Sequence, residues 1–422
     1  MAEAYPPLGR ARFAQAVLGA IAIVSSMDAQ ILLLLIEPIK QAMGLSDVEA
    51  GIANTTSYFA AYALLSAPLG VLADRANRVR MMLIAMAIWC VGLGFVAFAP
   101  GFWWLFGAKA LMGAASAAVM PAALSLYGDY FAPERRAAAT ATFSLGQILG
   151  GTAAVLVGGL GYSALQRVDP AWLLGLAPWR AVFFLSTLAL VPILVGLAAM
   201  REPARMEVAE RGGGSWRELW AHRGFLLPLM GGVIFLTGLS SAILTWIAPA
   251  LMRLYGQQPG DFAGWYAAVK LGSGIVGVLA AARLVEWARA REGQAAIMVP
   301  ATIGAIVCAP ATCMAIAPTL PLFAVGMTVF TFAFAIAIAV PVIAINLRIP
   351  NELRGRTVGL YVIFGAVGAA GATPLIALVS TAMGGEMMLG RAMAAVGVPL
   401  ALLAAACFAL ATRTRTGVEA AA

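Results

Sequence analysis

The stretch PLGVLADRANRVRM, residues 68–81, joins two apolar runs through a short charged turn. Only 11% of the 422 residues are charged, yet Asp74, Arg75, Arg78 and Arg80 all fall inside this turn. A charged turn between two long apolar runs is typical of a loop that connects two membrane-spanning helices. The composition of the rest of the chain decides whether this interpretation holds.

The composition is that of a membrane protein. Hydrophobic residues make up 62% of the chain, and its mean hydropathy is +0.91. Soluble domains are about 45–50% apolar and about 25% charged. A soluble core could not bury this much apolar surface, so we expect lipid to be the solvent for most of the chain.

Charge and reactive residues exclude several classes of function. The net charge is +8, but the arginines are scattered between apolar runs and form no continuous basic face, which argues against a nucleic-acid partner. The four cysteines lie in apolar runs and His222 is the only histidine, so no disulfide, metal site or cofactor is predicted. No nucleophile–base pair or phosphate-binding loop stands in a plausible context, so an enzyme is not expected.

Twelve apolar stretches are each long enough to cross the hydrocarbon core, which takes about 20 helical residues. The first is too long for the core of a signal peptide, so we expect it to remain as a membrane helix. The predicted fold is therefore an all-α membrane protein. The predicted spans lie near 13–36, 50–72, 81–99, 103–127, 138–162, 179–200, 224–252, 262–284, 294–316, 320–346, 356–382 and 390–411.

One polar segment divides the spans into two sets of six. Residues 201–223 contain three consecutive glycines and the amphipathic piece SWRELW. The predicted organisation is a bundle over 1–200, a cytoplasmic linker over 201–223 and a second bundle over 224–422. The loops repeat between the halves: GVLADRANRVR (70–80) is matched by ARLVEWARAR (282–291), and DYFAPERRA (129–137) by NLRIPNELRG (346–355). Duplicated halves are typical of secondary transporters.

The basic residues predict the orientation of the spans. With the N-terminus in the cytoplasm, 20 of the 27 lysines and arginines fall on the cytoplasmic side. Such a bias places both termini in the cytoplasm and residues 73–80 on the inner face. A bacterial-type inner membrane is the expected location.

The pattern Gly70-x-Leu72-Ala73-Asp74-Arg75-x-x-Arg78 resembles the signature loop of the major facilitator superfamily. That resemblance implies two pseudo-symmetric six-helix bundles that work by alternating access. It also implies that Asp74 reaches the start of the eleventh span and that Arg78 pairs with Asp129. The cytoplasmic gate predicted on this basis comprises Asp74, Arg75, Arg78, Asp129, Arg135, Glu286, Arg289 and Arg354. A merely solvated basic loop is the alternative, but it accounts for neither Asp74 nor the repeat.

Three longer stretches resemble the Spinster-like branch of this superfamily. They are MDAQILLLLIEPIKQAMGLSDVEAGI (27–52), PWRAVFFLSTLALVPILVGLAAMREPAR (178–205) and IPNELRGRTVGLYVIFGAVGAAGATPLIALVS (349–380). The resemblance implies a proton-linked or facilitative exporter, and animal members of the branch carry lysolipids and sphingoid lipids.

The chain also departs from the pattern of that branch. The usual Asp-Arg pair of the first span is Asp28-Ala29, and the usual arginine of the fourth span is Lys109. The acid that usually follows in the fourth span is replaced by Ser116. A network of two acids and two arginines is thereby reduced to one acid and one lysine.

Charges inside the spans mark the candidate coupling site. A charge near the bilayer centre costs roughly 2.5–3.5 kcal/mol on insertion scales, so Asp28 and Lys109 should be paired or should line a cavity. We expect them to face each other, with substrate or proton binding at Asp28 competing with the pair. A lock between the first and fourth spans is the structural alternative. Glu37, beside Pro38, is predicted to be a solvated acid at the end of its helix.

Other polar and aromatic residues of the spans are candidates for lining a substrate cavity. They are Gln30, Asn54, Tyr58, Ser116, Gln147, Trp246, Lys270 and Tyr361. Lys270 has the alternative of reaching to the outer surface. Two glycine series, Gly146/Gly150/Gly151 and Gly365/Gly368/Gly371, predict helix crossings where the halves rock.

Three functions remain open. The leading hypothesis is a monomeric, proton-coupled secondary transporter that moves a small amphipathic, organic or lysolipid-like solute across the lipid bilayer, with Asp28 as the proton site. The second is a facilitator or organic-anion exchanger that uses Lys109 and Lys270. The third is a non-transporting receptor that keeps the fold.

Overall fold

The computed structural model describes residues 5–206 and 215–413, and every regular element in these ranges is a helix. Twelve helical stretches among the described residues are long and apolar enough to cross a membrane. The prediction of an all-α protein with twelve membrane spans is therefore confirmed. By residue contacts the chain divides into two compact units, Met1–Ala209 with Gln258–Ala267, and Glu210–Gln257 with Ala268–Ala422.

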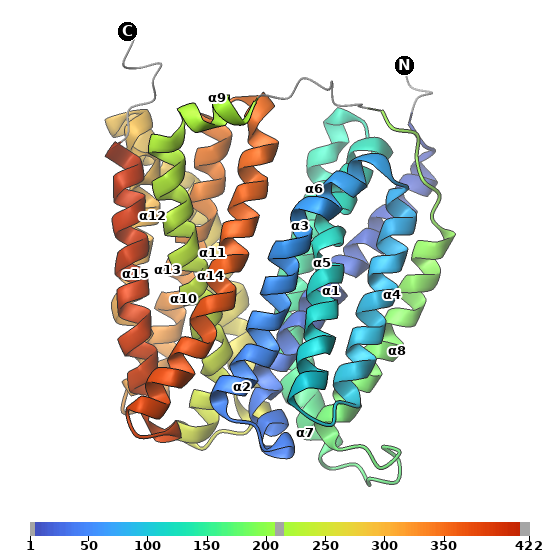
Figure 1. Cartoon of the computed structure of the whole chain (residues 1–422), viewed down its shortest axis with the longest axis vertical. Coiled ribbons are helices and arrows are strands. Elements are labelled where there is room, and N and C mark those ends of the chain that lie inside the picture. The colour runs from blue at the N-terminus through green and yellow to red at the C-terminus, as the bar shows by residue number, and fades with distance from the viewer. Residues whose placement is uncertain (1–4, 207–214, 414–422) are drawn as a thin grey trace. The chain divides into compact units, whose positions relative to one another are not determined.

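The first unit holds six spans. The second span is built from α2, η1 and α3, and the fifth from α6, η2 and α7, where η1 and η2 are single π-helical turns. Figure 1 shows α3, α4 and α5 side by side in blue and cyan. The helices are α1 (Leu8–Met43), α2 (Asp47–Gly51), η1 (Ile52–Thr56), α3 (Ser57–Arg75), α4 (Arg78–Ala97), α5 (Phe102–Tyr130), α6 (Pro133–Leu156), η2 (Val157–Gly161), α7 (Tyr162–Leu165) and α8 (Pro178–Ala199).

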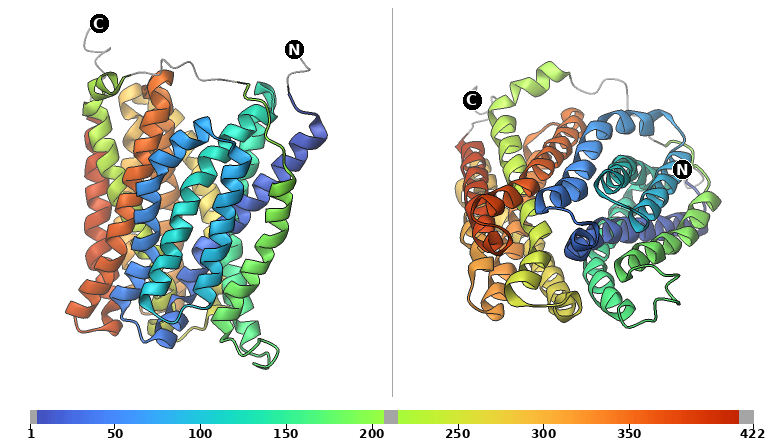
Figure 2. Two further views of the ribbon diagram at one scale, coloured as in Figure 1. Left: turned by 45° about the vertical axis from the view of Figure 1, so that its right-hand side comes forward. Right: turned by 60° about the horizontal axis from the view of Figure 1, so that its bottom comes forward.

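The second unit holds the other six spans and begins with a short helix. Figures 1 and 2 both show α10, α14 and α15 packed side by side. The helices are α9 (Trp216–Ala221), α10 (Arg223–Tyr255), α11 (Pro259–Glu292), η3 (Gln294–Met298), α12 (Val299–Ala311), η4 (Thr312–Ile316), α13 (Leu320–Arg348), α14 (Asn351–Ala382), η5 (Glu386–Met388) and α15 (Leu389–Arg413). The start of α11, residues 258–267, groups with the first unit.

Most helices extend beyond the apolar runs that predicted them. The first span, expected near 13–36, is the helix Leu8–Met43, and the fourth, expected near 103–127, is Phe102–Tyr130. Hydropathy detects only the part of a helix that lies in hydrocarbon, whereas backbone hydrogen bonds continue until a cap or a break ends them. The amphipathic piece of the linker is the helix α9.

The C-terminal end of α1 holds a buried group of charges. Gly44 adopts a left-handed conformation with φ of 66°, which ends α1 and turns the chain back into α2. Lys40 Nζ then lies 2.7 Å from Asp47 Oδ1, and Gln41 donates to Glu37 at 3.0 Å. Glu37 is only 3% exposed, so the prediction of a solvated acid was wrong. The turn at Gly44 folds polar groups over this end of the helix, a tertiary effect that hydropathy does not show.

Glycines allow α1 and α6 to cross at very short range in the first unit. A Cβ at Gly150 would overlap the carbonyl oxygen of Ile23, and one at Gly146 would lie 2.9 Å from the carbonyl oxygen of Gly19. The close approach predicted for this glycine series is confirmed. The crossing lies inside one unit.

The second glycine series behaves in part as predicted. A Cβ at Gly368 on α14 would overlap the carbonyl oxygen of Ile234 on α10, so these two helices also touch through backbone. A Cβ at Gly365 would make only ordinary contacts, and one at Gly371 would meet nothing within 4 Å. Of the three glycines, only Gly368 is required by packing. This crossing, too, lies inside one unit.

Candidate functional site

One face of α5 carries the fourth-span residues that distinguish this chain. Lys109, Gly113 and Ser116 are spaced four and three residues apart, which places them on one side of a helix. A Cβ at Gly113 would overlap the backbone carbonyl of Tyr58, so α5 and α3 are in contact there. The ammonium of Lys109 lies 5.2 Å from the centre of the Tyr58 ring, and Ser116 faces the Tyr58 hydroxyl.

Asp28 lies in the interior of the first unit. Its side chain projects from α1, and its exposed fraction is 0%. Trp89 on α4 and Ser186 on α8 face the carboxylate, but neither forms a hydrogen bond of normal geometry with it, and both carboxylate oxygens lack such a partner. A buried polar group without a hydrogen bond is rare in proteins and calls for an explanation.

Lys109 supplies the opposite charge. It interacts electrostatically with Asp28, although the two residues form no direct ion pair in the described part of the chain. The Tyr58 ring meets Trp89 edge to face, with ring centres 6.3 Å apart. We call Asp28, Tyr58, Trp89, Lys109 and Ser186 the buried charge cluster. Five helices, α1, α3, α4, α5 and α8, each contribute one of its members.

The buried charge cluster has a clear chemical capacity. A carboxylate and an ammonium in an apolar interior stabilise each other, and each destabilises the fold if the other is lost. Asp28 is the one acid of the cluster, so a proton taken up there would remove the negative charge that faces Lys109. Trp89 and Ser186 were not predicted for this site, because a tryptophan or serine in an apolar span carries no signal of its own.

The other first-unit candidates for a cavity lie in different surroundings. Gln30 donates to the carbonyl of Ser26 at 3.3 Å and lies against Gly151. Asn54 lies in the π-helical turn η1, buried, with its Nδ2 atom lacking a hydrogen bond. Gln147 on α6 is exposed.

Two of the three candidates of the second unit, Trp246 and Tyr361, form hydrogen bonds to other helices. Trp246 is buried, and its indole nitrogen donates to the carbonyl of Thr373 at 3.1 Å, which joins α10 to α14. The Tyr361 hydroxyl donates to the carbonyl of Ile338 at 3.4 Å. Lys270 lies in α11. A cavity role for these residues stays a prediction.

The opening charged turn holds a buried ion-pair network. Arg78 is almost fully buried, and its guanidinium contacts the Asp129 carboxylate, as expected from the sequence. It also donates from Nε to Glu202 at 2.7 Å and from Nη1 to the Ser125 hydroxyl at 2.8 Å. Glu202 was not among the predicted gate residues, although it lies only three residues after the sixth span.

The first residues of the linker are bound to this network. The second oxygen of Glu202 accepts from the backbone nitrogen of Val79 at 2.9 Å, and Asp129 accepts from the backbone nitrogen of Met206 at 2.9 Å. Arg205 donates to the carbonyls of Ala73 and Ala76 at 3.0 and 2.8 Å. We call residues 200–206 the linker strap. It binds the ends of α3, α4 and α5 within the first unit.

The remaining gate candidates do not join this network among the described contacts. Arg354 donates to the carbonyl of Asn346 at 2.8 Å, across the turn between α13 and α14. The side chain of Asp74 lies outside the described residues. The exposed residues of the set are Arg75, Arg135, Glu286 and Arg289.

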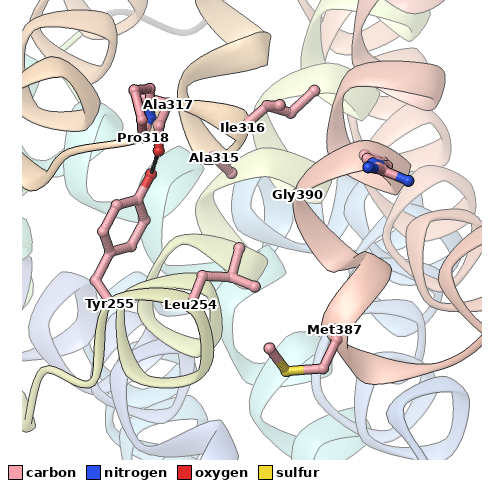
Figure 3. A pocket seen from close by; sticks show the side chains of 9 residues that line it. Leu254, Tyr255, Ala315, Ile316, Ala317, Pro318, Met387 and Gly390 are labelled. Carbon is pink, nitrogen blue, oxygen red and sulfur yellow. Dashed lines mark hydrogen bonds between the residues drawn. The ribbon is translucent and has the colours of Figure 1, made fainter.

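A small pocket opens at one end of the second unit, with a volume of about 200 Å³. Figure 3 shows that it lies between the end of α10, the turn after η4 and the start of α15. The Tyr255 hydroxyl donates to the carbonyl of Ala317 at 2.7 Å, and Arg391 is the charged residue of the lining. None of the residues predicted for a cavity lines this pocket. The described residues contain no group of three or more His, Cys, Asp or Glu placed to hold a metal ion.

Comparisons with known proteins identify two similar sequences. The chain is 24% identical over 413 residues to an MFS-type efflux pump of Mycolicibacterium smegmatis, a match that covers 95% of this chain and 93% of the pump. It is 28% identical over 279 residues to human protein spinster homolog 1, a match that covers 61% of this chain and 49% of the human protein.

A solved structure has the same fold. It is a bacterial homologue of the human lysosomal transporter Spinster, in an inward-facing and unoccupied conformation. The two chains superpose with a TM-score of 0.81 at 21% sequence identity, covering 98% of this chain and 99% of the other. The expected transporter fold and the resemblance to Spinster proteins are thus confirmed. Because the sequence profile of the Major Facilitator Superfamily matches residues 18–373, the chain belongs to that superfamily of secondary transporters.

Proposed function

We propose that this transporter moves a small amphipathic or organic solute, with lysolipid-like molecules among the candidates, and that Asp28 couples the movement to protons. The proposal depends on one observation: the Asp28 carboxylate is fully buried in a membrane span and has no hydrogen-bond partner of normal geometry. Ionisable groups at such depth are costly and are usually part of an ion or proton pathway. The similarity to an efflux pump and to a Spinster homologue supports a role in solute transport.

The coupling step that we propose is an exchange at the buried charge cluster. While Asp28 is ionised, its attraction to Lys109 draws α1 and α5 together. When Asp28 takes up a proton, that attraction disappears and the Lys109 ammonium keeps only the face of the Tyr58 ring. The relative free energies of two arrangements of the first unit would then depend on the proton, as alternating access requires.

We further propose that the charged turns are the cytoplasmic gate of a monomer in a bacterial-type inner membrane, with both termini inside. The basic bias of the loops supports this orientation. In this proposal the chain consists of a bundle over 1–200, a linker over 201–223 and a bundle over 224–422. Because Arg78 and Asp129 both lie in the first unit, their ion pair would shape that side of the gate.

The test is transport in proteoliposomes with an imposed pH gradient, measured on a panel of lysolipids, organic acids and cationic drugs. We expect Asp28→Asn to abolish uptake driven by the gradient, in a protein that is less stable than the parent but still folds. Glu37→Gln is the matched control, because Glu37 is a second buried acid on α1 outside the cluster. Full gradient-driven uptake by Asp28→Asn would refute proton coupling at this residue.

A facilitator or organic-anion exchanger is the second candidate, and one observation favours it. The Lys109 ammonium lies over an aromatic ring and forms no direct ion pair with Asp28, so it is available to an anionic group. This candidate predicts that Lys109→Gln or Lys270→Gln abolishes counterflow of organic anions, while Asp28→Asn retains it. Absence of counterflow for every class of solute would instead favour a non-transporting receptor.

A further inference from the structure

The short helix α9 exposes two large aromatic side chains. Trp216 and Trp220 are 62% and 59% exposed, whereas Leu219 between them is only 4% exposed. The two tryptophans are four residues apart and therefore lie on the same side of the helix. α9 packs on α10 and α14 within the second unit, so the buried Leu219 faces protein, whereas more than half of each tryptophan is exposed.

The position of α9 along the chain sets its depth. His222 ends α9 and at the same time precedes the first residue of α10, and α10 is a membrane span that starts at Arg223. A side chain only a few residues before a span must lie close to the boundary between hydrocarbon and water. Tryptophan is enriched at this boundary, because its ring is apolar and its N–H is polar.

The charges around α9 are mainly positive. Arg217, next to Trp216, and Arg223, three residues after Trp220, are both exposed. The Arg356 guanidinium lies 5.4 Å from the centre of the Trp216 ring. The one acid of the helix, Glu218, accepts hydrogen bonds from the backbone nitrogen and hydroxyl of Ser215 in a capping box. The helix therefore presents aromatic rings and arginines together.

We propose that α9 is an interfacial anchor that binds the anionic phospholipid surface of the leaflet where α10 enters the membrane. The tryptophan rings lie among the headgroups and the upper acyl chains, and Arg217 and Arg223 bind lipid phosphates. This partner is favoured over a soluble protein, because the bilayer is already present at this depth and its anionic headgroups complement the arginines. The anchor holds the end of the linker at the membrane surface and is independent of the transported solute.

The test uses the full chain in nanodiscs of phosphatidylcholine, with or without phosphatidylglycerol. Subtracting the emission spectrum of Trp216→Phe/Trp220→Phe from that of the parent isolates these two tryptophans from the ten in the chain. We expect this difference emission to be quenched by lipids brominated near the headgroup, and more strongly when phosphatidylglycerol is present.

Two arginine variants test the role of charge. Arg217→Gln/Arg223→Gln should lose most of the extra quenching caused by phosphatidylglycerol. The control variant Arg80→Gln/Arg135→Gln removes the same amount of charge from exposed positions in the first unit. It should retain the extra quenching caused by phosphatidylglycerol. The proposal is overturned if brominated lipid does not quench the difference emission while aqueous iodide does. It is also overturned if protection from iodide depends on protein concentration, which would indicate a second copy of the chain.

Discussion

Arg78 and Glu202 are 124 residues apart in the chain, yet the Arg78 Nε donates to the Glu202 carboxylate at 2.7 Å. The same carboxylate accepts from the backbone nitrogen of Val79, an N–H at the start of α4 that has no partner within its own helix. One side chain of the linker strap therefore neutralises a buried arginine and also caps a membrane helix. These contacts connect the segment after the sixth span to the charged turn between the second and third spans.

Loss of Arg78 should destabilise the protein strongly. In Arg78→Ala, the carboxylates of Asp129 and Glu202 lose their shared guanidinium, and breaking a buried ion pair costs about 3–5 kcal/mol. Arg78→Lys should be intermediate, because an ammonium cannot reproduce the forked donor geometry. Thermal unfolding of the purified protein in detergent measures the effect.

A double-mutant cycle separates the contribution of the linker strap. Arg78→Gln and Glu202→Gln should show a coupling of about 1 kcal/mol or more, within the range known for contacting residues. Glu134→Gln, an exposed acid in the first turn of α6, is the control and should show no coupling to Arg78→Gln. Additive effects for the Arg78 and Glu202 pair would show that the strap is not held by this contact.

The charged turn also illustrates what the sequence could predict. The pairing of Arg78 with Asp129 follows from the resemblance of residues 70–78 to a known loop. Glu202 lies in a segment whose composition is typical of a polar linker. Nothing in its local sequence predicts that the chain folds back and contacts the start of α4. A contact across so many residues depends on where the sixth span ends, which hydropathy locates only to within a few residues.

Replacement of either charge in the buried charge cluster should be tolerated less well than replacement of both. Lys109→Met leaves Asp28 as a buried group with no opposite charge and no hydrogen bond of normal geometry. Adding Asp28→Asn removes that charge, so the double variant should regain part of the lost stability. The measurement is thermal unfolding in detergent at neutral pH.

Tyr58→Phe is the matched control for this experiment. It keeps the aromatic ring beside Lys109 and removes only the hydroxyl, so it should leave the coupling between Asp28 and Lys109 unchanged. If the double variant proves less stable than Lys109→Met alone, the electrostatic interpretation of the cluster fails, and Asp28 stabilises the fold by another contact.

Hydropathy located all twelve spans of the fold. It did not predict features that depend on backbone geometry, such as turns and irregular helical turns. It could not show that Gly44 turns the chain so that Lys40 pairs with Asp47, or that Glu37 is buried, because both depend on tertiary contacts. It also could not show the π-helical turns η1 and η2, which change the register of a helix without changing its composition.

Crossing of α1 and α6 depends on a single hydrogen atom at Gly150. A methyl group there would overlap the carbonyl oxygen of Ile23, so Gly150→Ala should force the two helices apart and destabilise the first unit by about 1–3 kcal/mol. Unfolding in detergent reports this change. The Gly150→Ala substitution should also lower the yield of folded protein from the membrane.

A second glycine serves as the control for this substitution. Gly107 lies in α5, where a Cβ would meet nothing within 4 Å, so Gly107→Ala should be neutral or stabilising by up to about 1 kcal/mol. Equal effects of the two substitutions would mean that helix propensity, rather than the approach of α1, explains the result at Gly150.

Cysteine labelling tests the orientation of the first unit. Asp169 lies in the segment after α7, and Arg135 lies in the first turn of α6, so they flank the fifth span on opposite sides. In a variant with the four native cysteines replaced, Asp169→Cys should react with a membrane-impermeant maleimide in intact cells. Arg135→Cys should react only after the membrane is permeabilised, because the arginine-rich turns are retained on the cytoplasmic side. The reverse pattern would place the charged turn of residues 73–80 outside the cell and would rule out its role as a cytoplasmic gate.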